Sequence, residues 1–350
     1  MQGSFKKTIC LMIMVFLGAC NFSQATPIPV TPSVPATPSH FSEKETATLA
    51  SLKKVDDYPL YTMQYFGEYA PRETSLLPAL RNAHSTPGWA CSLFTVLLDE
   101  EHLLYGRNFD WQYSPALLLF TDPPDGYASV STVAMEYLDI SSETISNLTD
   151  LPLEEREGLL YAPYLPFDGM NEHGLAIGMA AVDPGGMRAD PSKETMGSLG
   201  IMREILDHAR DVDEAVDIIN QYNIDFEGGP PIHYLLADAK RKSVLVEFYR
   251  GEMHVIENEM PWHFATNFLI SSVLDPRDGN CWRYDMISDR MNEMQGMLDA
   301  RFAMELLADV AQDITQWSVV YQMAHGEVSI AMGRDYSEIH TFKISDFWNP

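Results

Sequence analysis

The sequence predicts an α+β fold, and two observations support this prediction. Apolar, β-branched and aromatic runs typical of strands cluster in five parts of the chain, within residues 91–120, 130–137, 174–182, 232–256 and 317–344. Helical patterns lie between these clusters, over residues 211–222, 280–291 and 299–311. Hairpins of strands and separate runs of helices are typical of layered α+β proteins and not of a parallel, alternating α/β sheet.

Size and charge narrow the class of protein. The 350 residues are 46% hydrophobic, which is enough to bury a sizeable core. The formal net charge is -27 at pH 7, and binding to phosphate backbones requires clustered Lys and Arg. We therefore expect no nucleic-acid partner, and the sequence leaves open whether the protein forms a homo-oligomer.

The first twenty residues are typical of an export signal. Lys6 and Lys7 precede an apolar run at residues 9–17, and the run ends in Leu-Gly-Ala followed by Cys20. The alternative is a transmembrane anchor, but the run is shorter than the ~20 residues that a spanning helix needs. The pattern resembles a bacterial lipoprotein signal, so we expect residues 1–19 to be a signal peptide and Cys20 to be lipidated. The protein is then expected to be extracytoplasmic and anchored by lipid to the bacterial cell membrane or envelope.

Two segments separate this signal from Cys91. Residues 20–40 contain "TPIPVTPSVPATPS", whose prolines favour polyproline II and indicate a semi-rigid stalk. Residues 41–90 include "DDYPLYTMQYFGEY", which is too aromatic for a linker. We expect this second segment to pack on the main domain at residues 91–350, as a propeptide or a small N-terminal subunit.

Two cysteines remain for the folded part. Cys10 lies in the signal and Cys20 is assigned to lipid, which leaves Cys91 and Cys281. They could form a disulfide in an exported protein. Alternatively, one of them is a nucleophile that must stay free.

A predicted hairpin relates Cys91 to two charged residues. The runs at 92–98 and 103–109 are joined by Asp-Glu-Glu-His, and a two-residue loop at Glu100–Glu101 would set Asp110 opposite Cys91. Simple alternation then sends Arg107 to the other face of the hairpin. Bringing Arg107 to the cysteine requires a bulge near Gly106 or a one-residue change of loop register.

The chemistry of a thiol suggests a purpose for this arrangement. A thiol is mostly protonated at pH 7, so a nucleophilic cysteine needs a base and a nearby positive charge, which Arg107 could supply. None of the histidines lies in an obvious cysteine-protease context. Cleavage between Ala90 and Cys91 would free an α-amino group, whose reference pKa of about 7.7 to 8.0 suits a general base. Asp110 could orient that amine.

Several motifs resemble one enzyme family. Cys91 is followed by "GRNFDW" at 106–111, and later segments are "DGMNEHGLAIGM" at 168–179, "HYLLADAKRKSVLVEF" at 233–248, "FATN" at 264–267 and "WSVVYQMAHGEVSIAMGRDYSEIHTFKI" at 317–344. Together they resemble the N-terminal nucleophile hydrolases of the choloylglycine hydrolase group, which includes penicillin V acylase, acid ceramidase and N-acylethanolamine acid amidase. The resemblance implies a four-layer αββα sandwich, with Cys91 exposed by autoproteolysis after Ala90, Arg107 beside its thiolate and Asp110 holding its amine.

The resemblance also implies roles for two later residues. Asn267 of "FATN" is the expected donor to the oxyanion, and Arg283 of "CWRYD" is an expected supporting arginine. A structural role is the alternative for these residues and for Asp110. Asn267 could be an ordinary residue at the end of a strand, Arg283 a solvated helix residue and Asp110 a structural cap. In one departure, bile-salt-hydrolysing relatives carry an oxyanion-binding asparagine where this chain has Ala181, so a backbone N–H replaces it or the substrate differs.

These expectations combine into one function and two alternatives. We expect a hydrolase that cuts a linear, non-peptide carbon–nitrogen bond of a small N-acyl amide, with no cofactor and no metal site. An acyltransferase on the same scaffold is the first alternative. A catalytically inactive surface lipoprotein that binds small ligands is the second.

Overall fold

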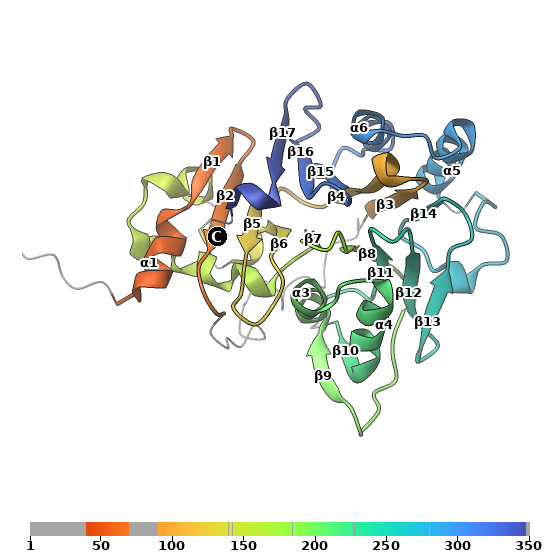
Figure 1. The fold of residues 1–350 in the computed structure, drawn as a ribbon, viewed down its shortest axis with the longest axis horizontal. Helices are drawn as coiled ribbons and strands as arrows, with labels where there is room; N and C mark the ends of the chain where they lie inside the picture. Colours follow the sequence, from red (N-terminus) through yellow and green to blue (C-terminus); the bar gives the residue numbers. More distant parts are fainter. Residues whose placement is uncertain are drawn as a thin grey trace, which may run out of the picture. The chain divides into compact units, whose positions relative to one another are not determined.

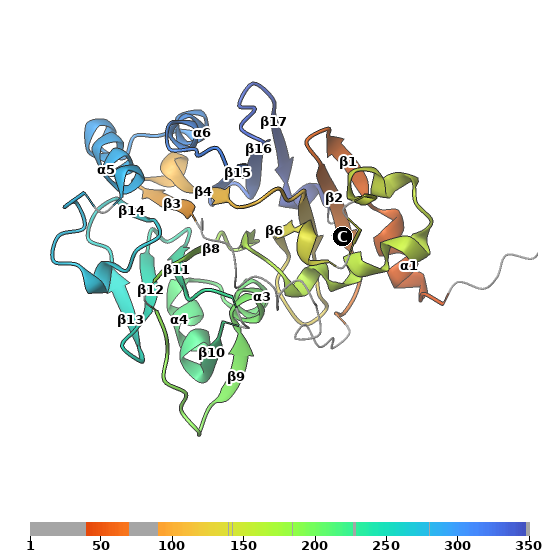
Figure 2. The ribbon, with the colours of Figure 1, turned by 180° about the vertical axis from the view of Figure 1, so that it is seen from behind.

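Two β-sheets that pack face to face form the centre of residues 41–350. The computed structural model describes residues 40–69, 90–138, 140–141, 143–183, 185–226, 229–279 and 281–347. The two sheets and the helices that cover them can be followed from opposite sides in Figures 1 and 2. Residues 1–39, with the predicted signal, Cys20 and most of the stalk, lie outside the described residues.

The larger sheet has nine strands. In spatial order they are β1 (Lys53–Asp56), β2 (Leu60–Tyr65), β5 (Ala116–Thr121), β6 (Ser129–Ala134), β7 (Asp168–Asn171), β8 (Ala176–Ala181), β11 (Ile232–Ala237), β12 (Ser243–Tyr249) and β13 (Glu252–Glu257). All neighbouring strands are antiparallel except β2 and β5, which are parallel.

The smaller sheet has six strands and carries the predicted nucleophile. In spatial order they are β14 (Trp262–Ala265), β3 (Ala90–Leu97), β4 (Leu103–Asp110), β15 (Thr315–Gln322), β16 (Glu327–Met332) and β17 (Ile339–Lys343). A separate pair of parallel strands is formed by β9 (Glu194–Gly197) and β10 (Tyr222–Asp225).

Helices cover the outer face of each sheet. On the nine-stranded sheet, α3 (Ser198–His208) packs on β7 and β8, and α4 (Val212–Gln221) packs on α3. On the six-stranded sheet, α5 (Trp282–Met294) packs on β14 and β3, and α6 (Ala300–Asp309) packs on β4 and β15. The layers are therefore αββα, as the resemblance implied.

The helices that the sequence predicted are present, and others were missed. The predicted helices correspond to α4, α5 and α6. Two further helices, α3 and α1 (Glu43–Ala50), were not predicted from the sequence. Most of α3 is buried, including the charged residues Arg203 and Asp207.

Residues 41–69 are part of the main sandwich. Strand β2 pairs along its whole length with β5, every residue of which is buried, and α1 packs on β2. The segment that is too aromatic for a linker therefore supplies strands at one edge of the nine-stranded sheet. Among the described helices, none is long and apolar enough to cross a membrane.

Two apolar clusters hold the layers together. The first includes residues from the space between the sheets, such as Leu93, Tyr105 and Trp317. The second joins the six-stranded sheet to its helices, for example Phe94 to Ile287 and Leu307. Strands β3 and β4 thus contribute to both clusters and are buried on both faces.

His263 lies in β14 and is expected to make stability depend on pH. Its Nδ1 is 3.1 Å from Ser243 Oγ of the other sheet, and burial lowers its pKa to about 4. As the pH falls, this residue gains a proton near pH 6.5 in the unfolded chain but only near pH 4 in the folded protein. The free energy of unfolding therefore decreases as the pH falls from about 7 to 4. Denaturant unfolding measures the free energy of unfolding at pH 7 and at pH 5. Between these two pH values, this free energy should fall by about 1–2 kcal/mol less in His263→Asn than in the wild type. The exposed His325→Asn is the matched control, and an unchanged pH dependence in His263→Asn would contradict the assignment.

Candidate active site

The register of the β3–β4 hairpin differs from the predicted register by one residue. Cys91 is paired with Phe109, and Ala90 is paired with Asp110. The prediction that Asp110 stands opposite Cys91 is therefore wrong. The connection is longer than two residues, because β3 ends at Leu97 and a short 3₁₀ turn at Glu100–His102 precedes β4.

This change of register brings Arg107 to the cysteine without a bulge. Arg107 is paired with Leu93, two residues from Cys91, so both side chains point to the same face of the hairpin. Gly106 has a packing role instead, because a Cβ there would lie 2.4 Å from Cζ of Phe94. Asp110 belongs to the opposite face, which α5 and α6 cover.

The Cys91 thiol lies beside a fully buried guanidinium. Arg107 Nη2 is 3.8 Å from Cys91 Sγ and donates to the Met179 carbonyl at 3.1 Å. The side chain of Cys91 is almost completely buried, and the structure holds both Cys91 and Cys281 as free thiols. Burial raises the pKa of the Cys91 thiol, whereas the charge of Arg107 opposes that rise. In this uncut chain the thiol is therefore held mainly in its protonated form.

Asp168 neutralises Arg107 from the other sheet. Its carboxylate accepts a hydrogen bond from Arg107 Nη1 and another from the Tyr321 hydroxyl at 2.5 Å. All three side chains are buried, and Asp168 lies in β7 while Arg107 and Tyr321 lie in β4 and β15. The ion pair thus links the two sheets and fixes the guanidinium in position beside the thiol. Asp168 is the first residue of the motif at 168–179, but nothing in the sequence assigns it a role.

The backbone of Cys91 is held by two predicted site residues. Its N–H donates to Asn267 Oδ1 at 2.6 Å, and its carbonyl accepts from Arg283 Nη1. Arg283 Nη2 also donates to Asn267 Oδ1 at 3.0 Å. Ala265 is paired with Leu93, so the same register carried two residues further sets Asn267 opposite Cys91.

Asn267 also contacts Ala181 at the end of β8. Its Nδ2 donates to the Ala181 carbonyl at 2.8 Å. The amide oxygen of Asn267 is therefore directed at the Cys91 nitrogen, and its amino group is directed at β8. In this chain, the methyl group of Ala181 supplies no hydrogen-bond donor.

The carboxylate of Asp110 is bound by groups other than the Cys91 nitrogen, whose N–H donates to Asn267. The Asp110 carboxylate accepts from Thr315 Oγ1 at 2.5 Å and from Gln312 Nε2 at 2.7 Å, and Arg283 Nη1 is 3.9 Å away. Burial raises the pKa of Asp110, and these two hydrogen bonds oppose the rise. Arg283 therefore lies between the Asp110 carboxylate and the Cys91 carbonyl and links the two.

A buried glutamate fixes the segment that follows Asn267. Glu247 of β12 accepts from the backbone N–H groups of Ile270 and Ser271 at 2.7 and 2.9 Å. Burial alone would raise its pKa, but hydrogen bonds from His233 and Ser271 lower it, so Glu247 is an anion. The loop that carries Asn267 is thus tied to β3 on one side and to β12 on the other. Sequence reasoning missed Glu247, although an acid inside the apolar run "SVLVEFY" was a usable signal.

One group of side chains in the described part of the chain has metal-ligand spacing. Asp56, Glu338 and His340 offer ligand atoms within 4.8 Å of one another. His340 Nε2 already bonds Asp56 Oδ2 at 2.8 Å, and Glu338 is largely exposed. These residues belong to β1 and β17 and its preceding turn, away from the strands that carry Cys91.

Comparisons with known proteins agree with this architecture. Residues 166–334 match the family model of acyl-coenzyme A:6-aminopenicillanic acid acyl-transferase, which is just under half of the chain. No curated protein matches the chain at the level of sequence.

The similarity is clearer in three dimensions. Crystal structures of two variants of the conjugated bile acid hydrolase from Clostridium perfringens superpose with TM-scores of 0.54 and 0.52, each at 14% identity, over 73% of this chain and 93% of theirs. Penicillin V acylase from Agrobacterium tumefaciens superposes with a TM-score of 0.46 at 14% identity, over 69% of this chain and 82% of its own. The two bile acid hydrolase structures thus share the fold of this chain at only 14% sequence identity.

Proposed function

Because the chain has the fold of the N-terminal nucleophile hydrolases, we propose that it is a cysteine amidohydrolase activated by its own cleavage. Its reaction is hydrolysis of a linear, non-peptide amide bond of an N-acyl compound. The observation that carries this proposal is the Cys91 thiol, 3.8 Å from the buried guanidinium of Arg107 and with its nitrogen bound by Asn267.

Maturation begins at the Ala90–Cys91 peptide bond. Cys91 Sγ attacks the Ala90 carbonyl carbon, and the carbon–nitrogen bond breaks as the acyl group moves to sulfur. Water then hydrolyses this thioester, which leaves a carboxylate at Ala90 and a free amine at Cys91. Asn267 Oδ1 accepts from the Cys91 N–H in the uncut chain, so the same oxygen is in place to accept from the new amine.

The new amine makes the thiol reactive. With a reference pKa of about 7.7 to 8.0, the amine takes the thiol proton as Sγ attacks the substrate carbonyl. Arg107 stabilises the thiolate, and backbone N–H groups stabilise the oxyanion together with the second N–H of Asn267 Nδ2, whose first N–H donates to Ala181. The amine product leaves with that proton, and water attacks the acyl-enzyme to release the acid.

The packing of residues 41–69 supports a two-chain mature enzyme. Their removal would expose the buried strand β5 along its whole length, because β2 covers that edge. We therefore propose that the piece before Cys91 stays bound as a small subunit. Mass measurement under denaturing conditions would then show two fragments, and native conditions would show one complex.

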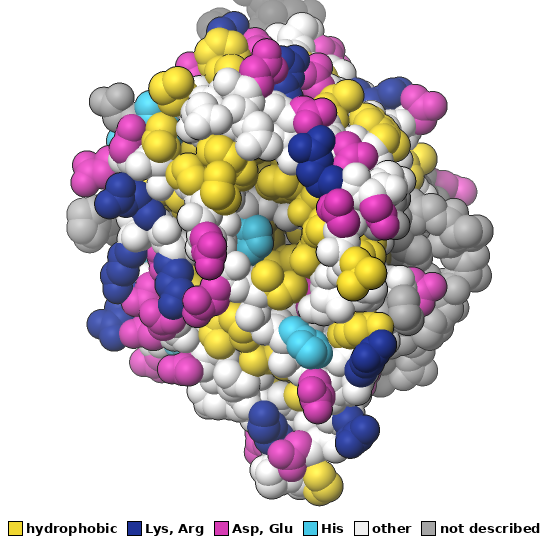
Figure 3. Space-filling model, turned by 90° about the vertical axis from the view of Figure 1, so that its right-hand side faces the viewer, with side chains coloured by type: hydrophobic (Ala, Val, Ile, Leu, Met, Phe, Trp, Pro, Cys, Tyr) yellow, Lys and Arg dark blue, Asp and Glu magenta, His cyan; other side chains and the backbone are white. Residues whose placement is uncertain are grey.

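One face of the molecule is suited to an acyl group. Figure 3 shows a hollow with hydrophobic side chains around it and a histidine within it, on the side that carries β13, β14 and α5. Exposed apolar side chains on these elements include Val255, Trp282 and Met286. An apolar hollow close to the strands that carry the nucleophile supports a substrate with a hydrocarbon portion.

The proposal is tested with a panel of N-acyl amides that differ in acyl length. The purified protein is expected to release acid and amine in equal amounts, as measured by mass spectrometry. An uncut protein with full amidase activity would refute the maturation step, and release of neither product from any amide would refute the hydrolase.

An acyltransferase is the second candidate, and the family-model match supports it. The same acyl-enzyme would pass its acyl group to an acceptor amine in place of water. Adding acceptor amines such as 6-aminopenicillanic acid distinguishes the two, because a transferase forms the new amide at the expense of the free acid.

The N-terminal pattern leads us to propose a lipid anchor at Cys20 outside the cytoplasm. The proline-rich stalk that follows would hold the domain away from the bacterial membrane. Labelling of cells with radioactive palmitate is expected to mark the protein, and Cys20→Ser is expected to remove the label.

A further inference from the structure

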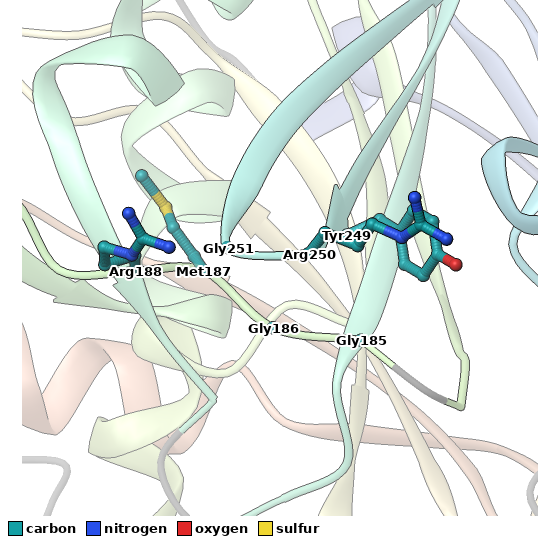
Figure 4. Close-up of a pocket in the computed structure, with 7 residues that line it drawn as sticks. All are labelled: Gly185, Gly186, Met187, Arg188, Tyr249, Arg250 and Gly251. Carbon is teal, nitrogen blue, oxygen red and sulfur yellow. The ribbon is translucent and has the colours of Figure 1, made fainter.

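Glu247 of β12 is a fully buried anion, and none of the chemical steps at Cys91 uses it. It lies close to the hairpin turn at Arg250–Gly251, which leads into β13. Figure 4 shows this turn beside Gly186, in the segment that follows β8. Gly186 N donates to the Phe248 carbonyl at 2.8 Å, and Gly251 N donates to the Gly186 carbonyl at 3.1 Å. The end of β12 that carries Glu247 is therefore held in place by the backbone around it.

The two carboxylate oxygens of Glu247 hold the loop that carries Asn267. Oε1 accepts from Ile270 N at 2.7 Å, and Oε2 accepts from Ser271 N at 2.9 Å. The other end of this loop is Ala265, the last residue of β14, which is paired with β3. The residues between these points are thus fixed at one end by a strand and at the other end by a single side chain. We call residues 266–271 the Asn267 loop.

His233 helps to keep Glu247 charged. Both side chains are fully buried, and His233 Nδ1 is 3.5 Å from Glu247 Oε1. A carboxylate oxygen only accepts, so Nδ1 carries the proton, and His233 Nε2 has no hydrogen-bond partner among the described residues. Burial raises the pKa of Glu247, and the hydrogen bonds from His233 and Ser271 reverse that rise.

Two other histidines lie near this pair, and each bonds a different group. His254 of β13 is paired with Glu247, but its Nε2 bonds the Tyr249 carbonyl. His263 of β14 bonds Ser243, and burial lowers its pKa to about 4, so it is neutral near pH 7. His233 is therefore the titratable group that bonds the carboxylate.

The side chain of Asn267 has two tasks that depend on a fixed loop. Its Oδ1 accepts from the Cys91 nitrogen at 2.6 Å and from Arg283 Nη2 at 3.0 Å. One N–H of its Nδ2 donates to the Ala181 carbonyl at 2.8 Å, and the proposed mechanism directs the other N–H to the oxyanion. After cleavage the Cys91 nitrogen is the end of a chain, so it restrains Asn267 less than in the uncut protein. The position of the Asn267 amide then depends on the backbone of its loop.

We propose that Glu247 is a positioning residue, which clamps the Asn267 loop and so places the Asn267 amide at the oxyanion. The effect on catalysis rests on the proposed hydrolytic function, whereas the clamp on the loop does not. The oxyanion forms only as the substrate carbonyl is attacked. A loosened loop therefore lowers kcat and leaves KM nearly unchanged.

The first test measures the loop itself. Glu247→Gln keeps the size of the side chain but turns an NH2 group toward one of the two backbone N–H groups. Hydrogen–deuterium exchange in peptides covering residues 266–272 is expected to be about tenfold faster than in the wild type, or more. Asp238→Asn is the matched control, because Asp238 is also buried and its carboxylate accepts from three backbone N–H groups around the β11–β12 turn. This control is expected to leave exchange in residues 266–272 unchanged.

His233→Phe tests the same clamp without altering the carboxylate. When the Nδ1 donor is removed, burial raises the pKa of Glu247, so the carboxyl group is protonated at a higher pH. Exchange of the Asn267 loop, corrected for its intrinsic pH dependence, is expected to match the wild type at pH 8 and to be faster at pH 5. Unchanged exchange in Glu247→Gln would overturn the clamp whether or not the protein is an amidase. If Glu247→Gln does not fold, unchanged exchange of His233→Phe at pH 5 overturns it.

Kinetics then test the link to catalysis, with the amide that the wild type hydrolyses fastest. Glu247→Gln is expected to lower kcat about 10- to 100-fold and to change KM by less than about threefold, because a displacement of about 1 Å has an effect of this size. Asp238→Asn is expected to keep the kcat of the wild type. A faster-exchanging loop with an unchanged kcat would overturn the positioning role, and so would an equal fall of kcat in Asp238→Asn. Absence of hydrolysis by the wild type itself would instead count against the proposed function.

Discussion

A Cys91→Ala variant is expected to remain a single uncut chain and to lose at least about 1000-fold in amidase activity. Sγ performs both the attack on Ala90 and the attack on substrate, so one substitution removes cleavage and turnover together. Intact-mass measurement and a product assay on the same preparation check both results. The loss should not come from misfolding, because alanine is smaller and apolar at a site that is nearly buried.

The other free thiol supplies the matched control. Cys281 precedes α5 and is partly exposed. Cys281→Ala is expected to be cut and active like the wild type. A Cys91→Ala protein that is still cleaved at Ala90, or a Cys281→Ala protein that is not, would refute the assignment of the nucleophile.

The second large effect is expected for Asp168→Asn, which removes the charge that neutralises Arg107. Breaking a buried ion pair on one side leaves an uncompensated charge, so the free energy of unfolding is expected to fall by about 3 kcal/mol. Arg107 also loses its fixed position beside the thiol, and a displacement of about 1 Å can reduce kcat/KM by roughly 100-fold. Denaturant unfolding and steady-state kinetics measure the two losses separately.

A pH profile distinguishes positioning from a merely structural role. In Asp168→Asn the guanidinium of Arg107 is no longer fixed beside the thiol, so its positive charge lowers the pKa of Cys91 less than in the wild type. The rate of labelling by a thiol-reactive probe should therefore rise at a higher pH in Asp168→Asn than in the wild type.

The chain offers a matched ion pair elsewhere. Asp207 is also buried and is bound by Arg203 at 2.6 Å, but within α3. Asp207→Asn is expected to lower stability to a similar degree and to leave both kcat/KM and the labelling profile unchanged. If Asp207→Asn impaired activity as much as Asp168→Asn, the effect of Asp168 would be one of stability alone.

Local patterns in the sequence were sufficient for most of the fold. Periodicity predicted the strands of five clusters and three of the helices, but it did not predict β1, β2, β7, β9, β10, β14, α1 or α3. Cys91, Arg107, Asn267 and Arg283 lie together in the structure, as the family resemblance implied. Asp168 and Glu247 could not be assigned roles in the same way. Each acts through a partner on a distant strand, and a single sequence carries no trace of that pairing.

The register of the β3–β4 hairpin shows where sequence reasoning ended. Both strands are buried on both faces, so their residues do not alternate between apolar and polar, and no pattern indicates which side chains share a face. The acidic tetrad between them was compatible with loops of different length. Only the packing of Cys91 and Arg107 against the other sheet, and of Asp110 against α5 and α6, selects one register.

By itself, the sequence determined the α+β class, the candidate nucleophile Cys91 and the types of residue expected around it. These depend on residue types and on short spacings along the chain. The tertiary structure decided which groups touch. It set Arg107 on the side of the thiol with Asp168 across from it, turned Asp110 toward Thr315 and Gln312, and directed Asn267 to the Cys91 nitrogen. The physical reason is that a one-residue change of register moves every side chain of a strand to the opposite face, and the two layers packed on a doubly buried strand determine that register.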